Sequence, residues 1–155
     1  MSFLDACIKG DITMFAKQIT VFIENRPGRL SQVLSVLKDN KVNILSLSLA
    51  DTTEFGLLRL IVDNAALGKE KLSESGFSSL LSEVSIIAIS HEVGNLQSLL
   101  HVIDKAGINI EYMYGLSIQA TEAYVVLKAT EAEKLDALLN ENGVKTLSCA
   151  DLATM

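Results

Sequence analysis

Residues 22–44 read FIENRPGRLSQVLSVLKDNKVNI, and residues 88–110 read AISHEVGNLQSLLHVIDKAGINI. A constant shift of 66 positions aligns the two stretches and carries Gly28 onto Gly94. This period is too long for a solenoid built from one or two short elements, and a pair of copies is too few for a repeat array. The chain is therefore predicted to contain a small domain that has been duplicated.

Each copy has the pattern of a strand followed by a helix. Residues 18–24 are rich in β-branched and aromatic side chains and stop at the turn-forming residues 25–28, which predicts a strand. The next segment has apolar residues at i, i+3, i+4 and i+7, the spacing of one helix face. These residues are Leu30, Val33, Leu34 and Leu37 in the first copy and Leu96, Leu99, Leu100 and Ile103 in the second.

The rest of each copy predicts a hairpin, a second helix and a last strand. The predicted hairpin strands are residues 43–50 and 57–62, then 109–117 and 123–128; the helices are 65–74 and 131–141; the last strands are 77–83 and 144–148. One extra residue near Gly115 raises the shift to 67, so that Gly56 aligns with Ala123.

The predicted fold class is α+β, with two ferredoxin-like βαββαβ units, each an antiparallel sheet with both helices on one face. We expect a leader at residues 1–16, which is not native or is disordered, a first domain at 17–83 and a second at 84–150. Met14 precedes the first strand; we expect either that Met14 is the natural start or that the leader is a short appended helix. Because no Pro- or Gly-rich linker joins the domains, we expect one rigid body, and pairing of open sheet edges predicts a continuous eight-stranded sheet.

Composition excludes several classes of partner. The net charge of −6 argues against nucleic acid and anionic membrane surfaces, which need clustered Lys and Arg. Apolar runs are all shorter than the roughly 20 residues of a membrane helix, and Asp5 and Lys9 interrupt any signal-peptide core. Cys7 and Cys149 lie at opposite ends of the chain, which indicates reduced thiols in a cytoplasmic protein.

The sequence also lacks the motifs of a catalytic or metal-dependent protein. It has no Gly-x-Ser-x-Gly elbow, no phosphate-binding Gly-x-x-x-x-Gly-Lys, and no His-Glu-x-x-His zinc motif. The two histidines, His91 and His101, exclude a histidine-rich metal site, although carboxylate sites stay open. We therefore expect no enzyme activity, no cofactor and no bound metal.

The segment Phe-Ile-Glu-Asn-Arg-Pro-Gly-Arg-Leu, followed after one helix by Asn-Lys-Val-Asn-Ile, resembles the signature of the ACT domain. ACT domains are regulatory modules that sense amino acids in metabolic enzymes such as phosphoglycerate dehydrogenase, and the resemblance covers residues 17–148. A tandem pair without a catalytic domain resembles the stand-alone two-ACT proteins. The resemblance implies a free amino acid as ligand, a homodimer, and a metabolic enzyme as possible partner.

A ligand site is predicted where each first helix begins. Gly28 lacks a Cβ and lets a ligand approach the backbone, while the free N–H groups and dipole of a helix N-terminus favour a carboxylate. The resemblance implies that Asn25 and Asn43 bind the polar groups of an amino acid across a domain interface. The candidate binding residues are Asn25, Arg26, Pro27, Gly28, Arg29, Leu30, Asn43 and Ile44, and in the second copy His91, Gly94, Asn95, Leu96 and Asn109.

The second copy departs from the motif, since His91, Glu92 and Val93 replace Asn, Arg and Pro. Glu92 would repel a carboxylate unless it turned away, so we expect one functional site and one structural copy. A purely structural interpretation also stays open, in which the glycines serve the turn and Asn43 and Asn109 only close the helix-to-strand connections.

Three other functions were weighed against amino-acid sensing. The first is a ligand-free interaction scaffold that acts through its sheet edges and faces. The second is an RNA-recognition module, which shares the element order but needs aromatic central strands and a basic surface, where this chain is acidic. The third is a metal chaperone, which needs paired thiols in the first loop, and residues 25–28 contain none.

Overall fold

The computed structural model describes residues 15–51, 54–116 and 122–155, so most of the predicted leader, including Met14, lies outside the described residues. The chain runs twice through strand, helix, two strands, helix and strand, and adds a short helix at the end. In order, the elements are β1 (Ala16–Glu24), α2 (Arg29–Asp39), β2 (Ile44–Asp51), β3 (Phe55–Val62), α3 (Ala65–Glu74), β4 (Ser78–Ile89), α4 (Asn95–Lys105), β5 (Ile110–Leu116), β6 (Ala123–Ala129), α5 (Ala132–Glu141), β7 (Thr146–Leu147) and α6 (Cys149–Ala153).

One strand, β4, belongs to both copies. The strands form a seven-stranded sheet of order β2-β3-β1-β4-β6-β5, with β7 also paired to β4. β4 pairs with β1 as far as Val84 and with β6 from Ser85 onward. The expectation of eight strands was therefore wrong, because the last strand of the first copy and the first strand of the second are one continuous strand rather than two paired edges.

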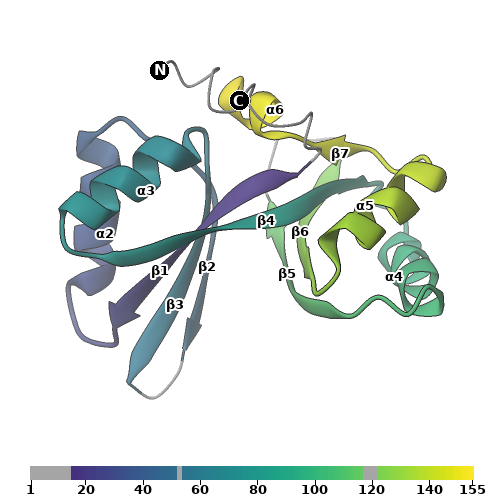
Figure 1. Cartoon of the computed structure of the whole chain (residues 1–155), viewed down its shortest axis with the longest axis horizontal. Coiled ribbons are helices and arrows are strands. Elements are labelled where there is room, and N and C mark those ends of the chain that lie inside the picture. The colour runs from purple at the N-terminus through teal and green to yellow at the C-terminus, as the bar shows by residue number, and fades with distance from the viewer. Residues whose placement is uncertain (1–14, 52–53, 117–121) are drawn as a thin grey trace.

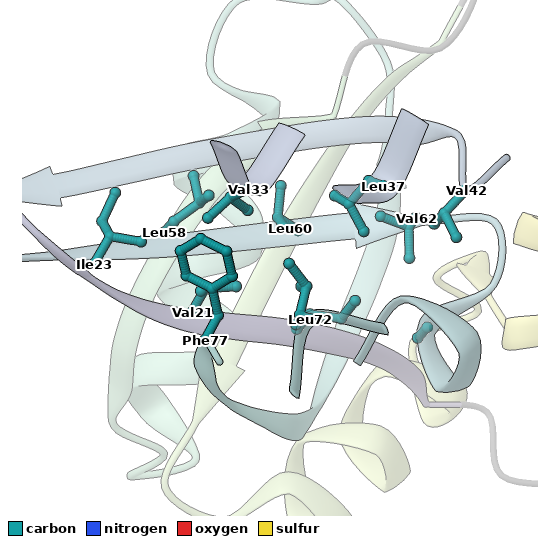
Figure 2. Close-up of a cluster of buried hydrophobic side chains, with 12 residues drawn as sticks. Val21, Ile23, Val33, Leu37, Val42, Leu58, Leu60, Val62, Leu72 and Phe77 are labelled. Atoms are coloured by element: carbon teal, nitrogen blue, oxygen red, sulfur yellow. The ribbon is translucent and has the colours of Figure 1, made fainter. Parts of the chain in front are cut away.

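The helices of the two copies lie on opposite sides of the molecule, with the strands between them (Figure 1). In the first copy, alternate residues of β1 and β3 face α2 and α3 and form an apolar core with Val33, Leu37 and Leu72. Figure 2 shows this core, which includes the ring of Phe77. A second helix-side core surrounds Ile103, Leu135 and Leu139 in the other copy. The α+β class and the two ferredoxin-like units are confirmed.

The sheet faces that point away from the helices pack against each other and join the two copies. Their apolar contact is the cluster Ala16, Ile61, Val84, Ile86, Leu116, Tyr124, Val126, Leu147 and Leu152. Beside it, the fully buried Gln18 donates to the Tyr112 hydroxyl at 2.7 Å and accepts from the Tyr114 hydroxyl at 2.6 Å. The guanidinium of Arg59 lies 3.7 Å from the centre of the Tyr112 ring. This face-to-face contact has no direct signal in the sequence.

The predicted helix 65–74 matches α3, whose first turn is capped where Asn64 accepts from Leu67 N–H at 3.0 Å. The terminal helix α6 was not predicted. Its signal is Ser148 with Asp151 three residues later, a capping box in which each side chain bonds the other's backbone N–H. Leu152 of α6 covers the central cluster, so this helix belongs to the junction between the copies.

The extra residue predicted near Gly115 lies further along the hairpin. Leu116 pairs with Tyr124 as Ala50 pairs with Leu57, so the shift changes from 66 to 67 between Leu116 and Tyr124. Most of that connection, residues 117–121, is outside the described residues. Among the helices described, none is long and apolar enough to cross a membrane.

Candidate functional site

The loop that opens α2 is exposed and is closed by backbone bonds. Asn25 N–H donates to the Glu54 carbonyl oxygen at 3.2 Å, and Arg26 Nε lies 2.6 Å from a Glu24 carboxylate oxygen. Pro27 is exposed, and Gly28 has a φ of 86°, a left-handed conformation that side chains with a Cβ rarely adopt. Gly28, the residue before α2, has no side chain to cap the helix, and the first N–H of α2, that of Arg29, donates to the Arg26 carbonyl oxygen at 3.4 Å.

The other candidates of the first copy lie under or beyond the loop. Arg29 stacks over Phe77, with its guanidinium carbon 4.9 Å from the ring centre. Leu30 and Ile44 are half-buried and pack against the helix-side core. Asn43 N–H donates to an Asp63 carboxylate oxygen at 2.9 Å, a contact that joins the residue before β2 to the residue after β3.

Asn25 and Asn43 do not meet within one copy. They lie before and after the 11-residue helix α2, so about 16 Å of helix separates them. An amino acid is too small to span that length. A ligand that contacts both asparagines therefore needs a second ACT domain to supply one of them.

The second copy has the same backbone turn with different side chains. Gly94 has a φ of 91°, and α4 begins without a side-chain cap from the described residues. Asn95 Nδ2 donates to the Ser90 hydroxyl, Leu96 is half-buried, and His91 is exposed. Asn109 Nδ2 donates to the Thr130 hydroxyl at 3.3 Å, at the position that corresponds to Asn43 and Asp63.

The two helix-opening loops lie at opposite ends of the molecule (Figure 1). The end of β1 that leads into the first loop pairs with the start of β4, where Phe22 faces Ser78. The second loop follows the other end of β4, a 12-residue strand about 40 Å long. The first loop therefore lies away from the contact between the two copies, whereas Ala88, two residues before the second loop, packs against that contact.

A pocket of about 610 Å³ lies beside the second loop, a size within the range of small-molecule sites. Its lining includes Ile89, Asn95, Leu99, Glu122, Val144 and Lys145. Of these, Asn95 was a predicted site residue, and the exposed His91 and Glu92 are not part of the lining. Glu122 and Lys145 were missed from the sequence because they lie outside the loop motif. Aligning the two copies at a shift of 67 places them opposite Phe55 and Ser78 of the first copy.

Two opposite charges face each other at this pocket. Lys145 Nζ lies 3.3 Å from a Glu122 carboxylate oxygen, which also accepts from the Tyr124 hydroxyl at 2.7 Å. The Tyr124 hydrogen bond and the Lys145 charge lower the pKa of Glu122, and the hydrogen bond with Glu122 raises the pKa of Lys145. Both side chains are therefore ionised at neutral pH. In the part of the chain that the structure describes, no group of three His, Cys, Asp or Glu residues is arranged to hold a metal ion.

Comparison with known proteins agrees with this architecture. The family model described as an ACT domain pair matches residues 14–155, and the chain belongs to this regulatory family. Protein BT0572 from Bacteroides thetaiotaomicron is similar in structure, with a TM-score of 0.86, 32% identity, and coverage of 92% of this chain and 98% of that one.

More distant solved structures share the fold. The regulatory subunit of aspartate kinase from Thermus thermophilus, in a ligand-free form, has a TM-score of 0.61 and 16% identity, with coverage of 83% of this chain and 92% of that one. The Thermus flavus subunit has a TM-score of 0.55 and 18% identity, with coverage of 81% and 90%. No curated protein matches the chain significantly.

Proposed function

We propose that this protein is a non-catalytic sensor that binds a free amino acid at a helix-opening loop and an interface between ACT domains. The observation that carries the proposal is the left-handed glycine at the N-cap of a helix, present at Gly28 and again at Gly94. The N–H groups of a first helical turn and the helix dipole favour the carboxylate of an amino acid. Membership of the ACT domain pair family supports a regulatory role.

The proposal includes a homodimer in the cytoplasm. A site that joins Asn25 to Asn43 requires a second ACT domain, and the domain within the same chain lies away from the loop. β2 is an edge strand of the sheet, and Leu47 and Leu49 on it are 46% and 49% exposed. Apolar side chains on an open edge favour a protein neighbour. Light scattering at micromolar concentration should give twice the mass of one chain; the mass of one chain would contradict the dimer.

Ligand binding would then act through linkage. An amino acid that bridges two ACT domains stabilises the arrangement that holds both halves of the site together. A metabolic enzyme that contacts the protein in only one arrangement would respond to the amino-acid concentration. The aspartate kinase regulatory subunits of similar fold are consistent with such a partner.

Thermal unfolding with each of the twenty amino acids at millimolar concentration tests the proposal. A ligand at 100 times its dissociation constant adds about 2.7 kcal/mol, which shifts the midpoint by roughly 5–10 °C for a chain of this size. We expect one or a few amino acids to produce the shift and Asn25→Ala or Asn43→Ala to reduce it. Each variant is first melted without ligand, so that a change in the fold itself is separated from a loss of binding.

The ligand-free scaffold is the second candidate function, because large apolar side chains are exposed over the first copy. Phe22 and Leu80 are each 41% exposed on the face away from the helices, and Phe55 is 53% exposed. If no amino acid shifts the midpoint while the fold is intact, the scaffold becomes the better explanation.

A further inference from the structure

The pocket beside the second loop lies where the first copy has an aromatic side chain in its core. Phe77 of the first copy corresponds to Val144 of the second. The Phe77 ring is 7% exposed and belongs to the core shown in Figure 2. Arg29, which corresponds to Asn95, lies over the outer side of the ring at 4.9 Å. In the first copy this position is therefore packed with side chains.

Burial of the neighbouring residues shows the effect of the missing ring. Val33 and Ile23 are 0% and 4% exposed in the first copy. Their counterparts Leu99 and Ile89 are only half-buried, and both line the pocket. The second copy thus exposes an apolar surface that its fold does not cover.

The second copy also adds opposite charges at the mouth of the pocket. Glu122 and Lys145 stand where the first copy has Phe55 and Ser78. The Tyr124 hydroxyl holds the Glu122 carboxylate, and the Lys145 carbonyl oxygen accepts from Ala88 N–H at 2.9 Å, which ties the start of β7 to β4. The two side chains are 45% and 61% exposed, so their ion pair contributes little stability and opens readily to admit a ligand.

We propose that the second copy, not the first, holds the amino acid, and that the ligand is an aliphatic amino acid bound in this pocket. Glu122 accepts from the ligand ammonium group, Lys145 and the N-terminus of α4 bind its carboxylate, and its side chain lies against Leu99 and Val144. This inference rests on the proposed function and places its site at the second loop, so Asn25→Ala and Asn43→Ala should here leave the affinity unchanged. It reverses the expectation that the first copy, with the intact motif, carries the site.

The pocket offers what a zwitterion with an apolar side chain requires. Both charged residues are ionised at neutral pH, and the dipole at the N-terminus of α4 favours an anion. An aliphatic side chain would cover the surface that Phe77 covers in the first copy. The ligand therefore takes the place of a residue that the second copy lacks.

The test is isothermal titration of the full chain with L-alanine, L-valine and L-leucine, together with L-leucine methyl ester and N-acetyl-L-leucine. We expect at least one of the three amino acids to bind, and both blocked derivatives to bind at least ten-fold more weakly. Lys145→Gln and Glu122→Gln should each raise the dissociation constant about ten- to a hundred-fold, the effect of losing a charge-assisted hydrogen bond. Val144→Phe, which copies the first domain, should abolish binding.

Lys71→Gln is the matched control, because Lys71 forms an equivalent ion pair with Glu74 at 2.8 Å on α3, away from the pocket. The Lys71→Gln variant should bind the amino acid with the affinity of the original protein. Unchanged affinity in the Lys145, Glu122 and Val144 variants would show that the ligand does not bind in this pocket. If those variants bind normally while Asn25→Ala does not, the inference fails and the proposed function stands. If none of the twenty amino acids binds, both fail.

Discussion

Replacing the buried Gln18 by methionine should destabilise the contact between the two ACT domains. The change removes the amide that bonds the hydroxyls of Tyr112 and Tyr114, with donor–acceptor distances of 2.7 and 2.6 Å, while keeping a side chain of similar size. Both tyrosines are half-buried, so water reaches them in part and each lost bond costs about 1 kcal/mol or slightly more. We expect the free energy of unfolding to fall by about 2–3 kcal/mol in a urea titration.

A mutant cycle distinguishes this polar network from simple packing. Tyr112→Phe with Tyr114→Phe leaves the buried Gln18 amide with only the Thr20 hydroxyl, at 3.1 Å, and should also cost about 2–3 kcal/mol. The triple variant removes the amide and both tyrosine hydroxyls, leaves only the Thr20 hydroxyl without the Gln18 donor, and should lie within about 1–2 kcal/mol of the original protein. If the triple variant instead loses as much free energy of unfolding as Gln18→Met and the double tyrosine variant lose together, the reasoning is refuted. The losses would then come from changes in shape and not from unpaired polar groups.

Three further perturbations test other parts of the structure. Burial, with a smaller contribution from Tyr112, raises the pKa of Tyr114 in the folded protein. The neutral Tyr114 therefore stabilises the fold fully below about pH 10, and this stabilisation is lost as the pH rises through the higher folded-state pKa. In urea titrations between about pH 9 and 12, the free energy of unfolding should decline less steeply for Tyr114→Phe than for the original protein, and equal slopes would contradict the shift. Phe77→Val should lower the free energy of unfolding by about 2–3 kcal/mol, since it opens the core and removes the Arg29 contact, and a loss below about 1 kcal/mol would argue against a packed ring. Gly28 has a φ of 86°, so Gly28→Ala should lower the free energy of unfolding by about 1–2 kcal/mol in thermal melting. Gly115 has open space around it and no positive φ, so Gly115→Ala should change that free energy by less than about 0.5 kcal/mol. Equal effects of the two substitutions would contradict a strained turn at Gly28.

The candidate site could be predicted only in part. Gly28 and Gly94 were found from the sequence because each stands in a turn directly before an amphipathic helix; their left-handed conformation was not predicted. Glu122 and Lys145 were missed because each follows a different element and only the folded hairpin and β7 bring them within 3.3 Å. The separation of Asn25 from Asn43 follows from the length of α2, which the sequence indicated without showing that a second domain is then needed.

The sequence by itself determined the duplication, the element order and the helix faces, because periodicity, turn residues and the motif are local properties of the chain. It also indicated that no linker separates the copies, as β4 confirms. Only the tertiary structure decided that the copies share this strand and pack through the faces away from their helices, because that choice depends on long-range burial around residues such as Ile61 and Val126. The open pocket of the second copy is likewise a tertiary property: replacing Phe77 by Val144 in the aligned sequence is an ordinary apolar exchange, and only the packed core shows that the ring fills a space which the valine leaves empty.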